Sequence, residues 1–381
     1  MITAQEHSFD RRTTFLVSRD GITTAEANQT PINPIIIDAK TESGTTLLRI
    51  ARRLAADAFE TQPLNGKARL VRVIKIPAKL AAVDGFSRIA LGCMDQILTS
   101  AQLVRQGGDA DGDTGSDREA LHQTRAGLRR LRAAFTAFKS ILLSADLETW
   151  KKEATWLAGE LNSARDLDVF IEHVSSLTGK KKSGGDPAWA LFGSRLLMMR
   201  AAAYEQALAA IASQRFAAFI SDGAKWADAA TGQPAADTQA THLRDGNSSV
   251  LARQTLSRLH HRLRKAGGHL TKLDPAGRHV ARISAKKLRY TAEFFGKTFD
   301  KREERHRRRY IASLAALQEA LGRLNDLAMV EKCACAVAGH SAELAFHAGQ
   351  IIGDRRAEQG RLLAKAARAY GRWREAKPFW H

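Results

Sequence analysis

The residues best suited to chemistry form a pattern of one histidine and several cations that occurs twice. The two copies are His122, Arg125, Arg129, Arg130 and Arg132, and then His279, Arg282, Lys286, Lys287 and Arg289. In both, the cations follow the histidine at offsets of 3, 7, 8 and 10 residues. On a helix, offsets of 3, 7 and 10 return to the side of the histidine, and only offset 8 points away. The repeated spacing predicts two helix faces that meet an anion.

Phosphate groups are the anions that suit these side chains. The guanidinium fork of arginine can grip two phosphate oxygens, and each charge-assisted hydrogen bond stabilises by roughly 1.5 to 3 kcal/mol. From His122 to Lys139 the sequence has five Lys or Arg and no acid, so Lys139 extends the basic track. A protonated histidine donates from both ring nitrogens, so His122 and His279 are expected to join the site. A structural role that bridges helices stays open for both, whereas surrounding arginines disfavour a metal ion.

Helices must position this pattern. The spacing of Leu, Ala, Phe and Ile predicts helices at 78–105, 117–143, 147–177, 187–229, 247–266, 275–298, 302–338 and 340–374. The polar residues 230–245 predict a linker. Ser116 with Glu119, and Asp274 with Pro275, are start signals for the two motif helices. Both histidines are therefore expected in the second turn.

Other features repeat in the same order. An Arg-Asp-Leu sequence at Asp166 follows the first motif helix, and an Asn-Asp-Leu sequence at Asp326 follows the second at nearly the same separation. We interpret the chain as a first repeat at 80–230, a linker at 231–246 and a second repeat at 247–381, each repeat a four-helix unit. Asp166 and Asp326 are expected to orient motif arginines by salt bridges. A general acid or base pair is the alternative.

Composition narrows the partner. The 381 residues include 59 Lys or Arg against 40 Asp or Glu, a formal net charge of +19. Such a surplus attracts polyanions, which leaves nucleic acid, an acidic membrane surface or a phosphate polymer as candidates. His260, His261 and the basic segment 301–309 are expected to extend the basic surface. No apolar run approaches the roughly 20 residues of a membrane span, and three cysteines do not make a disulfide framework, so a cytoplasmic protein is expected.

Residues 1–79 look unlike the rest. The β-branched residues 35–37 predict a strand or extended arm, followed by a helix at 44–59 and an alternating apolar piece at 70–76. This appendage faintly resembles the tail of a CYTH (triphosphate tunnel) domain. That domain needs an eight-stranded tunnel and an N-terminal Glu-x-Glu-x-Lys, and neither is present in this segment. We therefore expect no triphosphatase activity.

The main part of the chain resembles the conserved histidine α-helical domain family, CHAD. The resemblance covers residues 80–381 and rests on both motif copies with Tyr290, the Arg-Asp-Leu-Asp and Leu-Asn-Asp-Leu pieces, residues 213–216 ahead of Trp226, and the terminal Pro378-Phe379-Trp380. It implies an all-α fold: two four-helix bundles related by an internal pseudo-twofold around a basic channel, here with a small N-terminal α/β appendage. It also implies binding of inorganic polyphosphate and association with polyphosphate granules. Ala126 departs from the family's usual branched apolar residue.

Two hypotheses remain at this level. The favoured one is a non-catalytic polyphosphate-binding protein without cofactor or metal. The alternative is an enzyme or regulator of phosphate metabolism, in which Asp166 or Glu160 assists transfer. The sequence has no Gly-rich phosphate loop or nucleophile constellation to support catalysis. A nucleic-acid binder is the weakest candidate because the motif lacks interleaved aromatic residues for base stacking. Oligomeric state and preferred chain length stay open.

Overall fold

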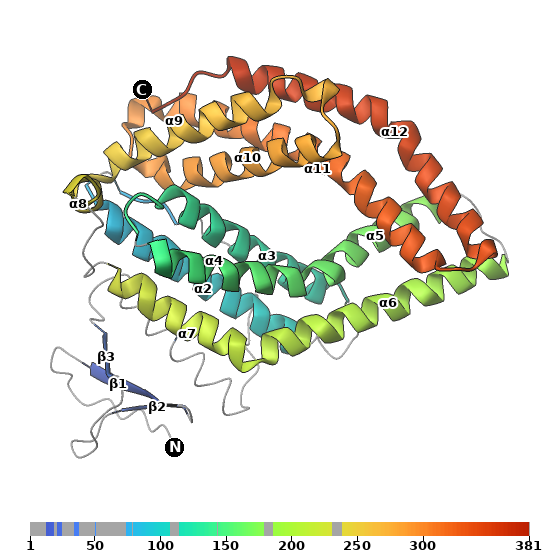
Figure 1. The fold of residues 1–381 in the computed structure, drawn as a ribbon, viewed down its shortest axis with the longest axis horizontal. Helices are drawn as coiled ribbons and strands as arrows, with labels where there is room; N and C mark the ends of the chain where they lie inside the picture. Colours follow the sequence, from blue (N-terminus) through green and yellow to red (C-terminus); the bar gives the residue numbers. More distant parts are fainter. Residues whose placement is uncertain are drawn as a thin grey trace. The chain divides into compact units, whose positions relative to one another are not determined.

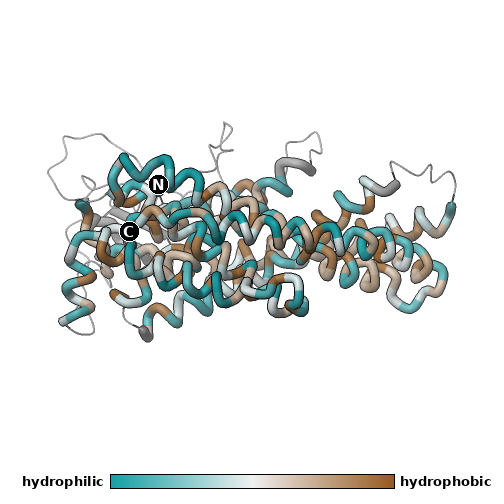
Figure 2. The backbone as a smooth tube through the Cα atoms, turned by 90° about the horizontal axis from the view of Figure 1, so that it is seen from above, coloured by the Kyte–Doolittle hydropathy of each residue, from teal (hydrophilic) through white to brown (hydrophobic). Residues whose placement is uncertain are grey.

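The computed structural model describes residues 13–18, 21–24, 34–37, 50, 74–77, 79–106, 114–142, 144–178, 186–230 and 238–380. From residue 82 to residue 375 the regular structure in these ranges is helical, so the all-α prediction is confirmed (Figure 1). Figure 2 shows apolar and polar residues alternating along the helical tubes, the pattern of helices that bury one side. The chain forms two compact units, Met1–Ile74 with Leu80–Leu157 and Ala210–Gly246, and Lys75–Lys79 with Ala158–Ala209 and Asn247–His381.

Three short strands precede the helices. They are β1 (Thr13–Ser18), β2 (Gly21–Thr24) and β3 (Pro34–Ile37), which form an antiparallel sheet in the order β2-β1-β3. Phe15 of β1 pairs with Thr24 on one side and with Ile35 on the other. The helix predicted at 44–59 lies outside the described residues except for Ile50, which is helical and buried. Residues 74–77 have no regular structure, and the rest of the predicted piece at 70–76 is not described.

The first unit is organised around one central helix. Its helices are α2 (Ala82–Gln106), α3 (Thr114–Ala137), α4 (Ser144–Glu160), α7 (Gln214–Ala229) and α8 (Thr238–Asp245). Helix α2 packs against α3, α7 and α8. Gly127 of α3 lies against Ile97 of α2, where a Cβ atom would come within 2.7 Å of the Ile97 side chain. The glycine therefore lets the first motif helix approach α2 closely. Phe86 and Trp226, with ring centroids 5.3 Å apart, join the cores of α2 and α7.

The second unit contains the longest helices. They are α5 (Asn162–Thr178), α6 (Pro187–Ala212), α9 (Ser248–Gly267), α10 (Pro275–Phe294), α11 (Glu304–Ala338) and α12 (Ala342–Glu375). Helices α11 and α12 run side by side, α11 also packs against α10 and α5, and α9 packs against α10 (Figure 1). Gly339 turns the chain between α11 and α12 with a φ of 56°, a value that favours glycine.

An aromatic cluster ties the chain's last residues to this unit. The ring centroids of Tyr310 and Trp380 lie 5.0 Å apart, and the Trp380 indole donates to Ser257 Oγ over 3.0 Å. His260 Nδ1 lies 2.7 Å from the Tyr310 hydroxyl, and the His260 ring packs on Trp373. The expectation that His260 extends the basic surface is therefore wrong, because its ring is held among aromatic residues. His261, one residue on, is exposed.

Two predicted long helices are broken in the structure. The helix predicted at 147–177 divides into α4 and α5 at Leu161, and that at 187–229 divides into α6 and α7 at Ser213. Ser213 caps α7, because its hydroxyl accepts from the Phe216 N–H over 3.1 Å. Within the predicted linker at 230–245, the last eight residues form the helix α8, and residues 231–237 lie outside the described part of the chain.

Of the two predicted starts of the motif helices, one is confirmed and one is wrong. Asp274 caps α10 as predicted, since its Oδ1 accepts from the Gly277 N–H over 2.7 Å with Pro275 at the first helical position. Helix α3 instead begins at Thr114, so Ser116 lies inside it and the predicted start is wrong. His279 falls in the second turn of its helix, whereas His122 falls in the third. Within the described ranges, no helix carries an apolar stretch long enough to cross a membrane.

The aromatic cluster gives a stability prediction. Trp380→Ala should lower the free energy of unfolding by about 3 to 5 kcal/mol, because a fully buried indole is removed and Ser257 loses its donor. Phe346→Ala is the matched control, since Phe346 is 65% exposed and should change stability by less than about 0.5 kcal/mol. Urea unfolding followed by circular dichroism measures both. Equal losses of unfolding free energy in the two variants would contradict a stabilising role of Trp380 in the aromatic cluster.

Candidate functional site

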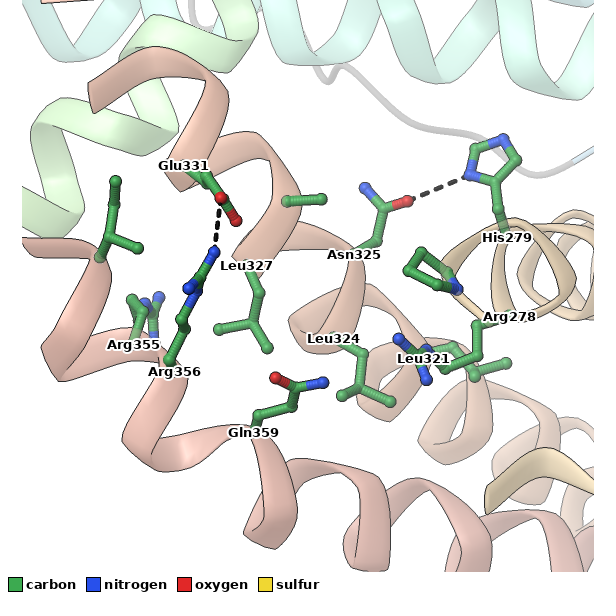
Figure 3. A pocket seen from close by; sticks show the side chains of 13 residues that line it. Arg278, His279, Leu321, Leu324, Asn325, Leu327, Glu331, Arg355, Arg356 and Gln359 are labelled. Atoms are coloured by element: carbon green, nitrogen blue, oxygen red, sulfur yellow. Dashed lines mark hydrogen bonds and ion pairs between the residues drawn. The ribbon is translucent and has the colours of Figure 1, made fainter. Parts of the chain in front are cut away.

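The second motif copy lies on α10, on the side that meets α11. His279 is exposed, and Arg282, Lys286 and Lys287 are partly buried. His279 Nδ1 lies 3.1 Å from Asn325 Oδ1 of α11 (Figure 3). Because an amide oxygen can only accept, Nδ1 carries the proton in this contact and the neutral ring has an accepting Nε2. A protonated ring would donate from Nε2 to an anion while it keeps its contact with Asn325.

Asp326, next to Asn325, is the acid around which several cations gather. Burial raises the pKa of Asp326, and the nearby charges of Arg282, Arg355, Arg165 and Lys286 act against that rise. These cations come from α10, α12 and α5, while Asp326 itself belongs to α11. Four helices therefore place charged groups around one carboxylate. An ionised carboxylate in such a place holds cationic side chains near one another that would otherwise repel.

A pocket of about 270 Å³ opens beside His279, between the start of α10 and the facing parts of α11 and α12 (Figure 3). Its lining combines an apolar part with polar groups: Pro275, Arg278, His279, Leu321, Leu324, Asn325, Leu327, Ala328, Glu331, Ile352, Arg355, Arg356 and Gln359. At one end Arg356 Nη2 donates to Glu331 Oε1 over 2.7 Å, and His279 and Asn325 lie at the other. The lining has no Phe, Tyr or Trp. It offers donors to an anion but no Phe, Tyr or Trp ring for base stacking.

The end of the second motif copy is held by its neighbours. Arg289 Nε donates to Gln318 over 2.8 Å, and its Nη1 donates to Glu293 over 2.7 Å. The guanidinium lies 4.8 Å from the centroid of the Tyr290 ring, within cation–π range. Tyr290 is only 4% exposed. Its geometry suits support of Arg289, and contact of Tyr290 with a ligand stays a prediction.

The first motif copy lies on α3 of the other compact unit. Arg130, the cation predicted to point away from the histidine, donates to Gln96 of α2 over 2.8 Å. Arg132 and Lys139 are exposed, whereas His122, Arg125 and Arg129 are partly buried. The cation at offset 8 thus contacts the neighbouring helix α2.

The first Asp-containing piece lies on α5. Asp166 is partly buried near Cys333 of α11, where burial, with the Asp166 charge adding to it, raises the pKa of the Cys333 thiol to about 11. Salt bridges from Asp166 and Asp326 to motif arginines stay predictions. Within the described ranges, no three His, Cys, Asp or Glu side chains gather as metal ligands would.

Several charged residues around the site were not singled out from the sequence. Asp168 is fully buried, and it accepts from Arg200 Nε over 2.8 Å and from the Tyr204 hydroxyl over 2.7 Å, which ties α5 to α6. Its only sequence signal is its place two residues after Asp166. Arg165 and Arg355 come from other helices, and only the tertiary fold brings them to Asp326.

Comparison with known proteins identifies the family. A family model for the CHAD domain matches residues 88–334, which is more than half of the chain. The chain belongs to the CHAD domain family. The match begins in α2 and ends in α11, so this CHAD protein carries both motif helices within the matched region. The family resemblance predicted from the motif is confirmed.

Two solved structures are similar to this CHAD protein. The crystal structure of the CHAD domain from the plant Ricinus communis has 25% sequence identity and a TM-score of 0.65, over 82% of this chain and 98% of that chain. PptA from Streptomyces chartreusis has 20% identity and a TM-score of 0.59, over 77% of this chain and 100% of that chain. No curated protein matches the chain. The helical fold is thus shared along nearly the whole length of both structures.

A partly buried histidine of α5, close to Arg355, gives a pH prediction. Burial, followed by the charge of Arg355, lowers the pKa of His173 to about 4 from 6.5. Between pH 6.5 and 4 the unfolded chain gains a proton that the folded protein does not, so His173 makes stability fall as the pH falls through this window. His173→Gln should reduce that fall, measured as the urea midpoint from pH 7 to 4. The exposed His261→Gln is the control, and an unchanged profile in His173→Gln would contradict the assignment.

Proposed function

We propose that this CHAD protein binds inorganic polyphosphate through its two motif helices. The observation that carries the proposal is the gathering of Arg165, Arg282, Lys286 and Arg355 around Asp326. Bringing four cations from three helices together is electrostatically unfavourable unless anions meet them. The partly buried carboxylate of Asp326 lies among them, and Arg355 also pairs with Glu358 over 3.0 Å. A phosphate chain would supply further negative charge.

The chemistry of the site favours polyphosphate over nucleic acid. Polyphosphate presents only phosphate oxygens, with about one negative charge per repeating unit, so recognition needs donors but no stacking surface. The pocket lining offers His279, Arg278, Arg355 and Arg356 and no Phe, Tyr or Trp. Single-stranded nucleic acids, in contrast, are bound with aromatic side chains on which bases stack. The CHAD resemblance independently implies polyphosphate.

Each group has a proposed role. The contacts to phosphate come from His122, Arg125, Arg129, Arg132 and Lys139 of the first copy and from His279, Arg282, Lys286 and Lys287 of the second. Arg130, held by Gln96, and Arg289, held by Glu293 and Gln318, are placed to support their helices and to add to the positive potential. Asp166 and Asp326 would orient motif cations. The protein would act by binding, without a chemical step, and would dock on polyphosphate granules.

The salt dependence of binding tests the proposal. Each neutralised phosphate should contribute about −0.7 to the slope of log affinity against log salt, by analogy with single-stranded nucleic acid. The triple variant Arg129→Gln, Arg132→Gln, Lys286→Gln should therefore make the slope shallower by roughly 2. Isothermal titration calorimetry with long-chain polyphosphate at several salt concentrations measures this.

The control removes the same charge elsewhere. Lys265, Arg368 and Arg372 are exposed and lie outside the motif, so Lys265→Gln, Arg368→Gln, Arg372→Gln keeps the net charge equal to that of the motif variant. It should leave the slope within about 0.5 of the unmodified protein. If both triple variants change the slope equally, binding depends on total charge alone and the motif has no specific role.

A further inference from the structure

Helix α6 is apolar on both sides, but within the described part of the chain only one of them is covered. Ala188, Phe192, Leu196, Ala203 and Ala207 are buried on the covered side. Both arginines of α6 have their partners there or at its edge: Arg195 donates to the Ala338 carbonyl over 3.1 Å, and Arg200 binds Asp168. A helix that is apolar all round is normally buried all round. The uncovered side of α6 therefore has the composition of a contact surface.

The uncovered side is a continuous row without charge. The residues of this row lie at helical spacing on the face opposite Phe192, and all of them are exposed. We call this row the α6 stripe; it consists of Ala190, Leu191, Ser194, Leu197, Met198, Ala201 and Ala202. Leu191, Leu197 and Met198 are 47%, 61% and 64% exposed. Single exposed apolar residues are ordinary, but a contiguous row of them marks an interaction site.

The α6 stripe is complementary to itself when two copies lie antiparallel. Its largest exposed side chains, Leu197 and Met198, stand at the centre. With a twofold axis between them, Leu197 of one copy meets Met198 of the other, and Ser194 meets Ala201. The small pair Ser194 and Ala201 lets the two helices approach while the central pair packs, as ridges of one helix fit into grooves of another.

We infer that two copies of this chain pair through the α6 stripe, antiparallel, α6 against α6. Charge supports this occupant. Two proteins that each carry a formal net charge of +19 repel, so they can meet most easily where no cation stands, and the stripe has none. A helix that lies on an anionic membrane carries Lys or Arg beside its apolar face. The exposed charged residues at the ends of this stripe are Asp186 and Glu205, which have the wrong sign for that surface.

The pairing should be reversible. The stripe spans 13 residues, roughly 20 Å of helix, and one helix pair of this length offers less area than the roughly 800 Å² per partner of a stable complex. We therefore expect a monomer–dimer equilibrium that shifts with concentration and strengthens at high salt, which screens the repulsion. The inference does not depend on polyphosphate binding.

Sedimentation equilibrium of the full chain at high salt tests the pairing. Met198→Glu should weaken the dimer by roughly 100-fold or more, because pairing would bury two carboxylates without partners. Val250→Glu is the matched control: Val250 is 49% exposed on α9, outside the stripe, and its replacement should leave the dimer unchanged. A protein that stays monomeric at every concentration, or a dimer that survives Met198→Glu, would overturn the inference.

Disulfide cross-linking tests the antiparallel arrangement. In a chain whose exposed Cys335 is replaced by serine, Met198→Cys should form a covalent dimer on mild oxidation, because residue 198 lies beside the twofold axis. Leu191→Cys should not, because the two copies of residue 191 would lie roughly 20 Å apart. Equal cross-linking at both positions would indicate parallel helices. Binding to phosphatidylcholine vesicles by a monomeric protein, lost in Met198→Glu, would assign the stripe to lipid instead.

Discussion

The structure depends on holding like charges close together on one side of a helix while the other side is packed against the protein. On α10 Arg282, Lys286 and Arg289 share one side with His279. The opposite side is buried through Ala281, Ala285 and Leu288. Repulsion between exposed cations is modest in water but grows where the surrounding protein excludes water. Apolar burial of roughly 25 cal/mol per Å² on the packed side offsets that repulsion. The cations thus keep fixed positions instead of spreading into solvent, which is what multivalent binding of a phosphate chain requires.

One partly buried carboxylate, Asp326, and one fully buried carboxylate, Asp168, complete this arrangement. Asp326 stands among cations from α5, α10 and α12, and Asp168 holds Arg200 and Tyr204 between α5 and α6. Removing one partner of such a group would leave a buried charge without compensation, at a cost of roughly 3 to 5 kcal/mol. We assign different roles to the two acids. Asp168 joins helices, whereas Asp326 lies where a ligand's phosphates would compete for the same cations.

The sequence predicted the parts of the fold that depend on local chemistry. The start of α10 followed from Asp274 and Pro275, and the all-α class followed from the spacing of apolar residues. The breaks at Leu161 and Ser213 were missed because neither has a proline or glycine at the break, and the apolar pattern continues across both. The capping-box sequence at Ser116 predicts a helix start there, yet α3 starts two residues earlier.

The sequence predicted cations of the site only where they lie within or beside the motif. The spacing of the motif set Arg130, at offset 8, apart from the other cations, and in the structure Arg130 donates to Gln96 of α2. Arg165 and Arg355, in contrast, reach Asp326 from helices far away in the sequence, and no local pattern marks them. His260 was misjudged for the same reason: its neighbours in sequence are arginines, but its neighbours in space are Tyr310 and Trp373. Tertiary packing decides both cases, and the spacing of residues along the sequence does not reveal it.

Selective binding of a phosphate polymer, and not mere attraction of any polyanion, is the property that we propose for these helices. Its most direct test compares the affinity of the unmodified protein for long-chain polyphosphate and for duplex DNA, at equal concentration of negative charge and at matched salt. We expect tighter binding of polyphosphate, because the pocket lining offers several donors to phosphate oxygens and no Phe, Tyr or Trp. We also expect the advantage to persist at salt concentrations that release DNA. Equal affinity for the two polymers, or tighter binding of DNA, would contradict it.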